Sequence, residues 1–376
     1  MVASGPPLGV IPRSLRVEQL KRLSFLCGLP VGGRKDELIA RLTAARTTPP
    51  PVRPRSGPVI LSIDLGIRNL AFSLLTPVSP SASASRKANA GSKKKGSTNQ
   101  SLSFLGTSPP TIKLHAWQRL SLLETTNNGS AQDGNEDAPD VETSAEVFSP
   151  AALAKTANAF LQETMLRLKP LPTHILIERQ RWRSGSAAAI QEWTVRVNTL
   201  EAMLHASLRT LREVNIWEGE VMSIRPERVG QLFLDLKKPD AGDDAAQDEV
   251  IEEDDVDVAG RKPRRKKTSG RKTSAEAKKL KIDLLGRWLS QGDLIIGPSN
   301  VEMGHMLDAY RDALKGTRRS KPKRTGREGE IEKNQVVLDK KLDDLTDSLL
   351  QGMAWLRWQE NTALLRLENG VEQLLG

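Results

Sequence analysis

Carboxylates at the ends of two apolar runs are the side chains of this sequence best suited to chemistry. Asp64 ends the run 59–63, and Glu178 ends the run 174–177. The local pattern predicts an apolar residue at each place, and a buried carboxylate is costly unless something positive binds it. A divalent cation is the usual partner of such oxygen ligands. The alternative for Asp64 is a turn acid that faces water, and this stretch alone does not decide between the two.

A third group of acids, Asp343, Asp344 and Asp347, lies in a long helix predicted at about 335–361. Leucines recur along this helix at helical spacing and form one stripe, whereas the three acids fall together on the opposite side. Acids opposite a leucine stripe normally form a solvated face. However, three carboxylates crowded on one turn repel each other unless a cation offsets their charge, and apolar residues continue the same face.

Strands and helices must bring these acids together. The run 59–75 predicts a strand, a glycine-containing turn and an antiparallel partner, and 111–117 predicts a third strand. A helix over 149–170 followed by a strand over 174–178 implies a right-handed crossover and parallel pairing. Sites form at the strand ends of such sheets, so the two acids that end strands are expected to be neighbours. Further helices are predicted near 190–211 and 276–290, and a short strand near 221–224.

The overall composition narrows the choice of chemistry and partner. The 376 residues include 56 Lys and Arg against 46 Asp and Glu, a net charge of +10 that favours a polyanionic partner. No apolar run approaches the ~20 residues needed to span a bilayer. The single cysteine, Cys27, excludes a disulfide framework and a cysteine zinc cluster. Carboxylates with a hard cation are therefore favoured over zinc or a Cys/His nucleophile.

Residues 14–46 predict a pair of helices separated by a glycine-rich turn. Arg34 and Lys35 follow two glycines at the start of the second helix, where backbone amides and basic side chains suit a phosphate contact. The stretch LKRLSFLCGLPVGGRKDELIARL resembles the SAP module, a small helical hairpin that binds DNA. The alternative is a hairpin that only packs on its neighbour.

Three signatures then appear in the order of a known family: IDLGIRNLAF, ILIERQRWRS and KKLDDLTDSLL. With the hairpin in front, they resemble the fungal mitochondrial Holliday junction resolvases, the eukaryotic relatives of bacterial RuvC. The resemblance implies an α/β fold, with a ribonuclease H-like mixed sheet flanked by helices, and a homodimer. It also implies Mg²⁺-dependent cutting of four-way DNA junctions, with Mn²⁺ expected to substitute, and no small-molecule cofactor or membrane partner. A mitochondrial location is expected, and residues 1–17 contain two arginines and no acid, which is compatible with import.

Carried over by position, the resemblance makes Asp64, Glu178, Asp344 and Asp347 the metal-binding acids. The Asp-x-x-Asp pattern of RuvC aligns best with the last two, so Asp343 stays a further catalytic candidate whose part is in doubt. Four carboxylates could hold two Mg²⁺ ions, one lowering the pKa of the attacking water and the other stabilising the leaving 3′ oxygen.

Basic and polar residues beside the acids are candidates for contacts with DNA. Gln180 and Trp182 are candidates to probe the opened centre of a junction, although Trp182 is equally well explained as a core residue. The predicted DNA-binding residues are Arg34, Lys35, Arg68, Arg179, Gln180, Arg181, Arg183, Lys340 and Lys341.

The expected organisation is a SAP-like module over 1–50, a proline-rich linker over 51–57 and the resolvase domain over 58–365. Polar or charged insertions near 79–110, 126–145, 237–275 and 315–334 cannot fill a core, so they are expected to be disordered. Two other functions stay open. One is a different ribonuclease H-like activity such as cleavage of hybrid strands, and the other is a non-catalytic DNA-binding or packaging protein. Intact acids in all three signatures argue against the second.

Overall fold

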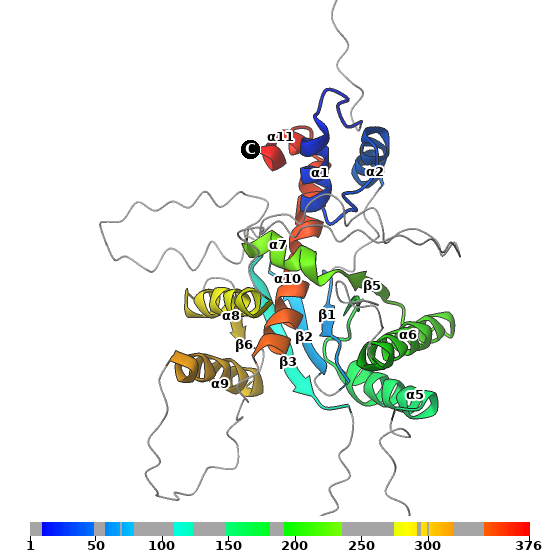
Figure 1. The fold of residues 1–376 in the computed structure, drawn as a ribbon, viewed down its shortest axis with the longest axis vertical. Helices are drawn as coiled ribbons and strands as arrows, with labels where there is room; N and C mark the ends of the chain where they lie inside the picture. The colour runs from blue at the N-terminus through cyan, green and yellow to red at the C-terminus, as the bar shows by residue number, and fades with distance from the viewer. Residues whose placement is uncertain are drawn as a thin grey trace, which may run out of the picture.

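A computed structural model describes residues 10–48, 57–67, 70–78, 109–122, 148–180, 192–234, 274–291, 295–298, 301–318 and 342–376. These residues form a six-stranded sheet with helices on both faces (Figure 1). The strands are β1 Ile60–Asp64, β2 Leu70–Pro77, β3 Ile112–Leu120, β4 His174–Glu178, β5 Glu220–Ile224 and β6 Ile295–Pro298. The longer helices are α1 Val17–Leu26, α2 Lys35–Thr47, α5 Pro150–Ala159, α6 Glu192–Glu213, α7 Pro226–Leu234, α8 Ser274–Gln291, α9 Val301–Arg318 and α10 Asp343–Leu365. No helix in these ranges is long and apolar enough to cross a membrane.

The strand order of the sheet is β5-β4-β1-β2-β3-β6. The first three strands are antiparallel, β4 returns parallel to β1, and β5 is parallel to β4. The predicted antiparallel start and the parallel crossover are therefore confirmed. Three elements of the sheet and its cover were not predicted, namely β6 at the β3 edge and the helices α7 and α9.

Alternating side chains divide the core into two layers. On β1, Leu61 and Ile63 belong to the apolar cluster that α5 and α6 cover, whereas Ile60 belongs to the cluster on the α10 side. Because successive side chains of a strand point to opposite faces, Asp64 shares the α10 side with Ile60. The same alternation on β4 places Glu178 on the side of Leu176, again toward α10. The sheet thus sends both strand-terminal acids toward the last long helix.

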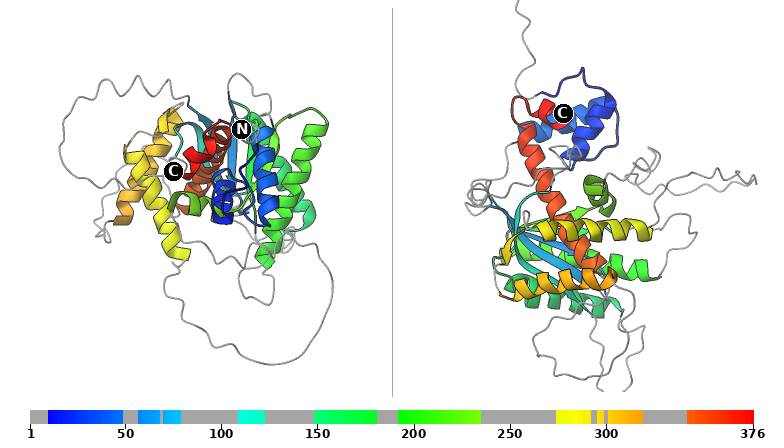
Figure 2. Two further views of the ribbon diagram at one scale, coloured as in Figure 1. Left: turned by 90° about the horizontal axis from the view of Figure 1, so that it is seen from above. Right: turned by 90° about the vertical axis from the view of Figure 1, so that its left-hand side faces the viewer.

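Helix α10 crosses that face of the sheet and continues beyond it (Figures 1 and 2). It packs on β1, β2 and β3. The approach is close at Gly352, where a Cβ atom would lie 2.6 Å from Leu75 Cδ2 and 3.3 Å from Ser62 Cβ. A Cβ atom there would force the Leu75 side chain to move and would press on Ser62, so glycine at this position lets α10 lie close to the sheet.

The N-terminal helices α1 and α2 pack on the part of α10 that extends past the sheet, beside α11 (Gly370–Leu375). The predicted helical hairpin is confirmed, and its identity as a SAP module stays a prediction. Gly28 ends α1 with a φ of +74°, and a Cβ there would lie 2.9 Å from Trp358 Cβ. Buried residues of the hairpin and of the sheet belong to one apolar cluster.

The predicted insertions fall mainly on residues 79–108, 123–147, 235–273 and 319–341, which lie outside the described ranges. The fourth predicted insertion began too early, because residues 315–318 continue helix α9. The pattern of lysine and arginine that suggested a loop there is also compatible with the last turn of a helix, where cations are favourable. The three domain boundaries stay predictions.

Candidate acidic site

Asp64 and Glu178 are neighbours at the carboxyl ends of β1 and β4. The two strands are parallel with Ile63 opposite Ile177, and each acid is the next residue of its strand. A hydrogen bond between their side chains favours the protonated form of Asp64. Burial and the adjacent Glu178 raise the pKa of Asp64 well above its usual range. Two carboxylates cannot both ionise at such separation without a positive partner.

The first turn of α10 brings further acids to this pair. After burial and Glu178, the charges that raise the pKa of Asp64 come from Asp347 and Asp344. Asp343 instead accepts a hydrogen bond of 2.8 Å from Lys278 Nζ on α8. The geometry therefore groups Asp64, Glu178, Asp344 and Asp347, and turns Asp343 toward a neighbouring helix.

A buried oxygen of Asp344 indicates that the acidic cluster is suited to a positively charged partner. Its Oδ2 atom is buried and has no hydrogen-bond partner among the described residues. Burial raises the pKa of Asp344, as does the adjacent Asp343, while Arg119 and Lys278 oppose the shift. An unpaired buried carboxylate oxygen is expensive, so the position is suited to a ligand that supplies positive charge.

Two lysines of α8 neutralise part of the acidic charge from the rim. Lys281 Nζ lies 2.9 Å from Asp347 Oδ1, and its side chain is only 15% exposed. Lys278 makes the corresponding ion pair with Asp343 and is more exposed. Sequence reasoning missed both residues, because nothing in the spacing distinguishes them from the other lysines of the same helix.

The donor types fit a hard divalent cation, since four carboxylates supply oxygen ligands and little else. The Asp344 oxygen that has no hydrogen-bond partner and the raised pKa of Asp64 indicate that a bound cation would stabilise this group of acids. In the described part of the chain, however, no three acidic, histidine or cysteine side chains are arranged to hold one ion as they stand. The acids must therefore turn before they can coordinate a metal together.

Gln351, one turn after Asp347, fixes α10 to the two acid-bearing strands. Its buried Nε2 lies 3.1 Å from Ser62 Oγ, 3.2 Å from the Ile63 carbonyl oxygen and 3.3 Å from the Leu176 carbonyl oxygen. One amide group thus sits between α10, β1 and β4, next to all three acid positions. Sequence reasoning missed this residue as well, because a single glutamine in a helix carries no pattern.

Other buried side chains hold the first turns of α10 against its neighbours. Trp117 Nε1 on β3 donates to the Leu345 carbonyl oxygen at 2.9 Å, and Ser73 Oγ on β2 donates to the Ser348 carbonyl oxygen at 3.1 Å. Tyr310 of α9 shares a 2.6 Å hydrogen bond with Thr346. Contacts with β2, β3 and α9 therefore position the end of α10 that carries the acids.

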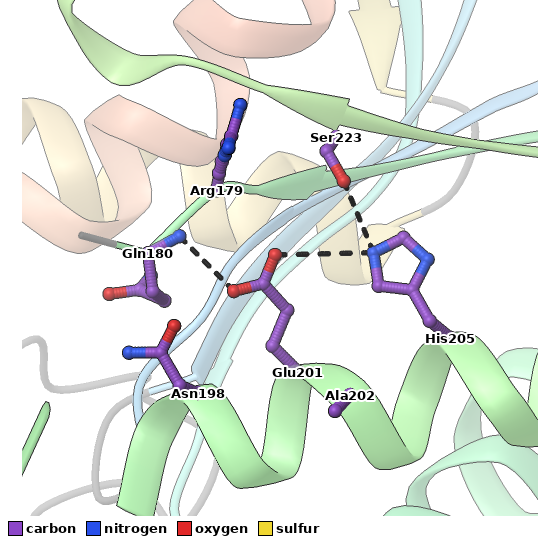
Figure 3. Close-up of a pocket in the computed structure, with 7 residues that line it drawn as sticks. All are labelled: Arg179, Gln180, Asn198, Glu201, Ala202, His205 and Ser223. Carbon is purple, nitrogen blue, oxygen red and sulfur yellow. Dashed lines mark hydrogen bonds and ion pairs between the residues drawn. The ribbon is translucent and has the colours of Figure 1, made fainter. Parts of the chain in front are cut away.

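A cavity of about 370 Å³ lies beside the cluster, between the end of β4 and α6 (Figure 3). Arg179 and Gln180, the two residues that follow Glu178, line one side of it. The Gln180 side-chain amide donates to the Leu65 carbonyl oxygen at 3.2 Å, which joins this wall to the residue after Asp64. The opposite wall is lined by Asn198, Glu201, Ala202 and His205 of α6 and by Ser223 of β5.

The predicted DNA-binding residues are distributed between several places. Arg179 and Gln180 line the cavity, whereas Arg34 and Lys35 lie at the start of α2. Glu37 Oε2 already accepts the Arg34 backbone N–H at 3.1 Å, so one of the amides predicted to face a phosphate is occupied. The hairpin contacts α10 at Trp358 and Asn361, away from its acidic first turn (Figure 1). The remaining predicted residues, Arg68, Arg181, Arg183, Lys340 and Lys341, lie outside the described ranges.

Comparison with known proteins gives a consistent result. The chain is 31% identical over 193 residues to the mitochondrial cruciform cutting endonuclease 1 of Schizosaccharomyces pombe. That match covers 51% of this chain and spans only 55% of the relative's length. The crystal structure of the yeast mitochondrial Holliday junction resolvase Ydc2 aligns with a TM-score of 0.49 and 22% identity, over 95% of this chain and 98% of that one.

The sheet order β5-β4-β1-β2-β3, with three antiparallel strands followed in the chain by two parallel ones, is a mixed sheet flanked by helices, as the signatures predicted. A family described as "Mitochondrial resolvase Ydc2 / RNA splicing MRS1" matches residues 60–365. This range includes all three acidic signatures and most of the chain. The chain belongs to this family of mitochondrial resolvase Ydc2 and RNA splicing MRS1 proteins.

Proposed function

We propose that this protein is a structure-selective DNA endonuclease that resolves four-way junctions by paired, symmetric nicks. The observation that carries the proposal is the convergence of four acids from β1, β4 and α10 at one strand end. Membership of a family that includes a mitochondrial resolvase supports the same activity. A mitochondrial location is part of the proposal, in keeping with the description of that family.

Asp64, Glu178, Asp344 and Asp347 would hold the metal ions, with Mg²⁺ as the proposed metal and Mn²⁺ as a substitute. When bound, such ions supply an activated water and stabilise the leaving 3′ oxygen. The protein itself contributes the four carboxylates and the strands and helix that bring them together, and no nucleophilic side chain is required. Asp343 is left as a support for the α8 contact, since it pairs with Lys278.

The cations around the cluster have a separate part in this proposal. Lys281 and Arg179 lie on two sides of the acids and are suited to hold the scissile phosphate by charge-assisted hydrogen bonds. When a phosphate and metal ions take up the site, Lys281 can exchange its bond to Asp347 for one to the phosphate. The overall net charge of +10 favours the approach of DNA.

A second candidate follows from the family description, which also includes an RNA splicing protein. In that case the chain would bind a structured nucleic acid without cutting it. The buried acids argue for cleavage, because a binding surface for phosphates gains nothing from an unpaired carboxylate such as Asp344. The two candidates differ in whether product strands form.

The test compares a four-way DNA junction with a linear duplex of equal sequence and with an RNA-containing four-way junction, each with and without Mg²⁺. We expect cuts in the DNA junction alone, and only with the metal. An Asp308→Asn protein is a suitable control, because Asp308 is an exposed carboxylate paired with Arg311 on α9. Binding of either junction without any cutting in Mg²⁺ or Mn²⁺ would favour the non-catalytic candidate.

A further inference from the structure

The cavity between β4 and α6 begins where the acidic site ends. Arg179 and Gln180 follow Glu178 directly, and the Arg179 backbone N–H donates to the Ile224 carbonyl oxygen at 2.8 Å, which continues the pairing of β4 with β5. The wall of the cavity is therefore a rigid extension of the strand that carries Glu178. Glu201 on the other wall lies close enough to Glu178 for the two negative charges to repel each other, so the cavity borders the acidic site.

The polar groups of the cavity are held in place before any ligand arrives. Glu201, with a side chain only 12% exposed, accepts the Gln180 backbone N–H at 3.1 Å through Oε2. Its other oxygen lies 4.0 Å from His205 Nε2, which in turn lies 3.2 Å from Ser223 Oγ (Figure 3). On the same wall, the Asn198 side-chain amide donates to the Thr194 carbonyl oxygen at 2.7 Å. Glu201 is thus an acceptor held in place between the Gln180 backbone N–H and the His205 imidazole.

This set of groups does not suit an anion or a metal ion. A phosphate in the cavity would meet the Glu201 carboxylate and lie close to Glu178. Burial raises the pKa of Glu201, so a second negative charge beside this carboxylate is unfavourable. Among the residues that line the cavity, a metal ion would find one carboxylate and one imidazole beside the positive charge of Arg179.

A neutral, planar group with donors and acceptors on its edge does suit the cavity. Arg, Gln, Asn, Glu and Ser are the residue types that contact base edges, and a glutamate accepts from an exocyclic amino group. A volume of about 370 Å³ lies in the range of small-molecule sites and can admit one base. Extrusion of a base costs least where stacking is already interrupted, as at the centre of a junction.

We infer that this cavity receives one unstacked base of the strand being cut, and that Glu201 accepts a hydrogen bond from the exocyclic amine of adenine or cytosine. Arg179 and Gln180 would then contact the sugar and phosphate of the same nucleotide. This inference rests on the proposed function and adds to it a choice of cleavage position, because guanine and thymine present a carbonyl oxygen where adenine and cytosine present the amine.

The experiment uses the full chain and junctions in which each base flanking the cut is varied in turn. We expect one position where adenine or cytosine supports cleavage about tenfold faster than guanine or thymine, the size of one good base contact. Replacement of that adenine by purine, which lacks the 6-amino group, should remove the advantage. In Glu201→Ala, adenine and purine should be cut at equal rates.

Glu213→Gln is the matched control, since Glu213 is an exposed carboxylate on the same helix, paired with Arg209. It should keep the preference of the unaltered protein. A Glu201→Ala protein that is slower on all bases by the same factor, with its preference intact, would overturn the inference and leave a structural role. Equal cutting at all four bases by the unaltered protein would also overturn it.

Two features keep the outcomes distinct. The comparison of adenine with purine needs no variant, so it remains decisive if Glu201→Ala fails to fold. Failure of the proposed function would appear as no cutting of any junction by the unaltered protein, whereas failure of the base pocket would appear as cutting without preference at any flanking position. Each result therefore tests either the proposed function or the base pocket, and not both.

Discussion

Asp64 lies where burial and three other carboxylates all oppose its negative charge. Its pKa is raised well above the usual range, first by burial and then by Glu178, Asp347 and Asp344. A proton on one carboxyl of the Asp64–Glu178 pair relieves this crowding when no metal is bound. A divalent cation would remove the need for that proton, so metal binding and proton release are coupled at this residue.

Asp64→Asn keeps the shape of the side chain and removes its charge. Because the altered residue can no longer help to hold a divalent ion, we expect junction cleavage to fall by several orders of magnitude. Junction binding should persist or tighten, since a negative charge facing phosphates is gone. Cleavage rate and junction affinity of the purified protein test this, with Asp308→Asn as the surface control. Near-normal cutting would remove Asp64 from the site.

The raised pKa also predicts how stability depends on pH without metal. A carboxyl whose pKa is higher in the folded state stabilises the fold while it is protonated, below its ordinary value of 3.8, and this contribution is lost as pH rises through the raised value. Thermal melting of the metal-free protein should therefore show a penalty at neutral pH that Asp64→Asn relieves. Adding Mg²⁺ should raise the melting temperature of the unaltered protein more than that of Asp64→Asn. Equal pH profiles for both proteins would contradict this.

At the scale of elements, the acidic site depends on how α10 is fixed to the sheet. The acids come from two strands and one helix, and Gln351 is the side chain that joins all three. Because its amide is buried, removal leaves the Ser62 hydroxyl and the carbonyl oxygens of the strands without this partner. The distance between α10 and the strand ends would then rest on packing alone.

We expect Gln351→Leu to lower the free energy of unfolding by about 2 kcal/mol, the cost of unsatisfied buried polar groups. At a saturating concentration of junction, the cleavage rate should fall by more than the loss of stability accounts for. A higher concentration of Mg²⁺ should be needed to reach half of the maximal rate. Asn361→Leu is the matched control, because Asn361 on the same helix is also buried but donates to the Leu26 carbonyl oxygen, away from the acids. If both proteins lose stability and activity in the same proportion, Gln351 has no special part in placing the acids.

The elements that carried the sequence prediction are those with local periodicity. The alternation around Asp64 and Glu178 predicted two adjacent parallel strand ends, and the sheet confirms this pairing. The leucine stripe predicted the long helix of the last acids, which α10 confirms. The metal-binding roles of these acids stay predictions.

What the sequence did not predict depends on contacts between distant segments. Lys281 pairs with Asp347 across 66 positions, and Gln351 reaches Ser62 across 289 positions. Neither side chain belongs to a periodic pattern, so no local signal could select it. The four-residue strand β6 was missed because so short a run carries too little alternation to recognise. The cavity beside α6 likewise forms only when β4 and β5 pack against that helix.

At the scale of the whole molecule, the N-terminal hairpin is joined to the body through α10 and α7. Arg228 of α7 donates to the carbonyl oxygens of Gly28 and Leu29 at 3.0 and 2.8 Å, and Asn361 donates to that of Leu26 at 2.6 Å. The apolar residues at this contact, including Trp358, are buried. The hairpin therefore covers core surface, whatever contact it makes with DNA.

Deletion of residues 1–56 would expose this surface and leave the end of α10 unsupported. We expect the shortened protein to melt at a lower temperature and to bind a hydrophobic dye, because the apolar face around Trp358 and Leu365 becomes exposed to solvent. A separable DNA-binding module predicts a different outcome, in which melting is unchanged and only junction affinity falls. Calorimetry and junction binding of the two proteins distinguish these outcomes.

Two opposed strands of a junction must be cut at equivalent positions, which requires two acidic sites related by a two-fold axis. Each chain supplies the acids of one site, so we predict a symmetric homodimer bound to one junction. Light scattering of the protein with and without a junction should give the mass of two chains. The sharper test mixes unaltered and Asp64→Asn chains, with a tag on each so that mixed dimers can be isolated. A mixed dimer should nick one strand and leave the opposed strand intact, whereas the unaltered dimer cuts both. If single chains were sufficient, the mixed preparation would still cut both strands in the same junction, at a lower rate, and scattering would show one chain per junction.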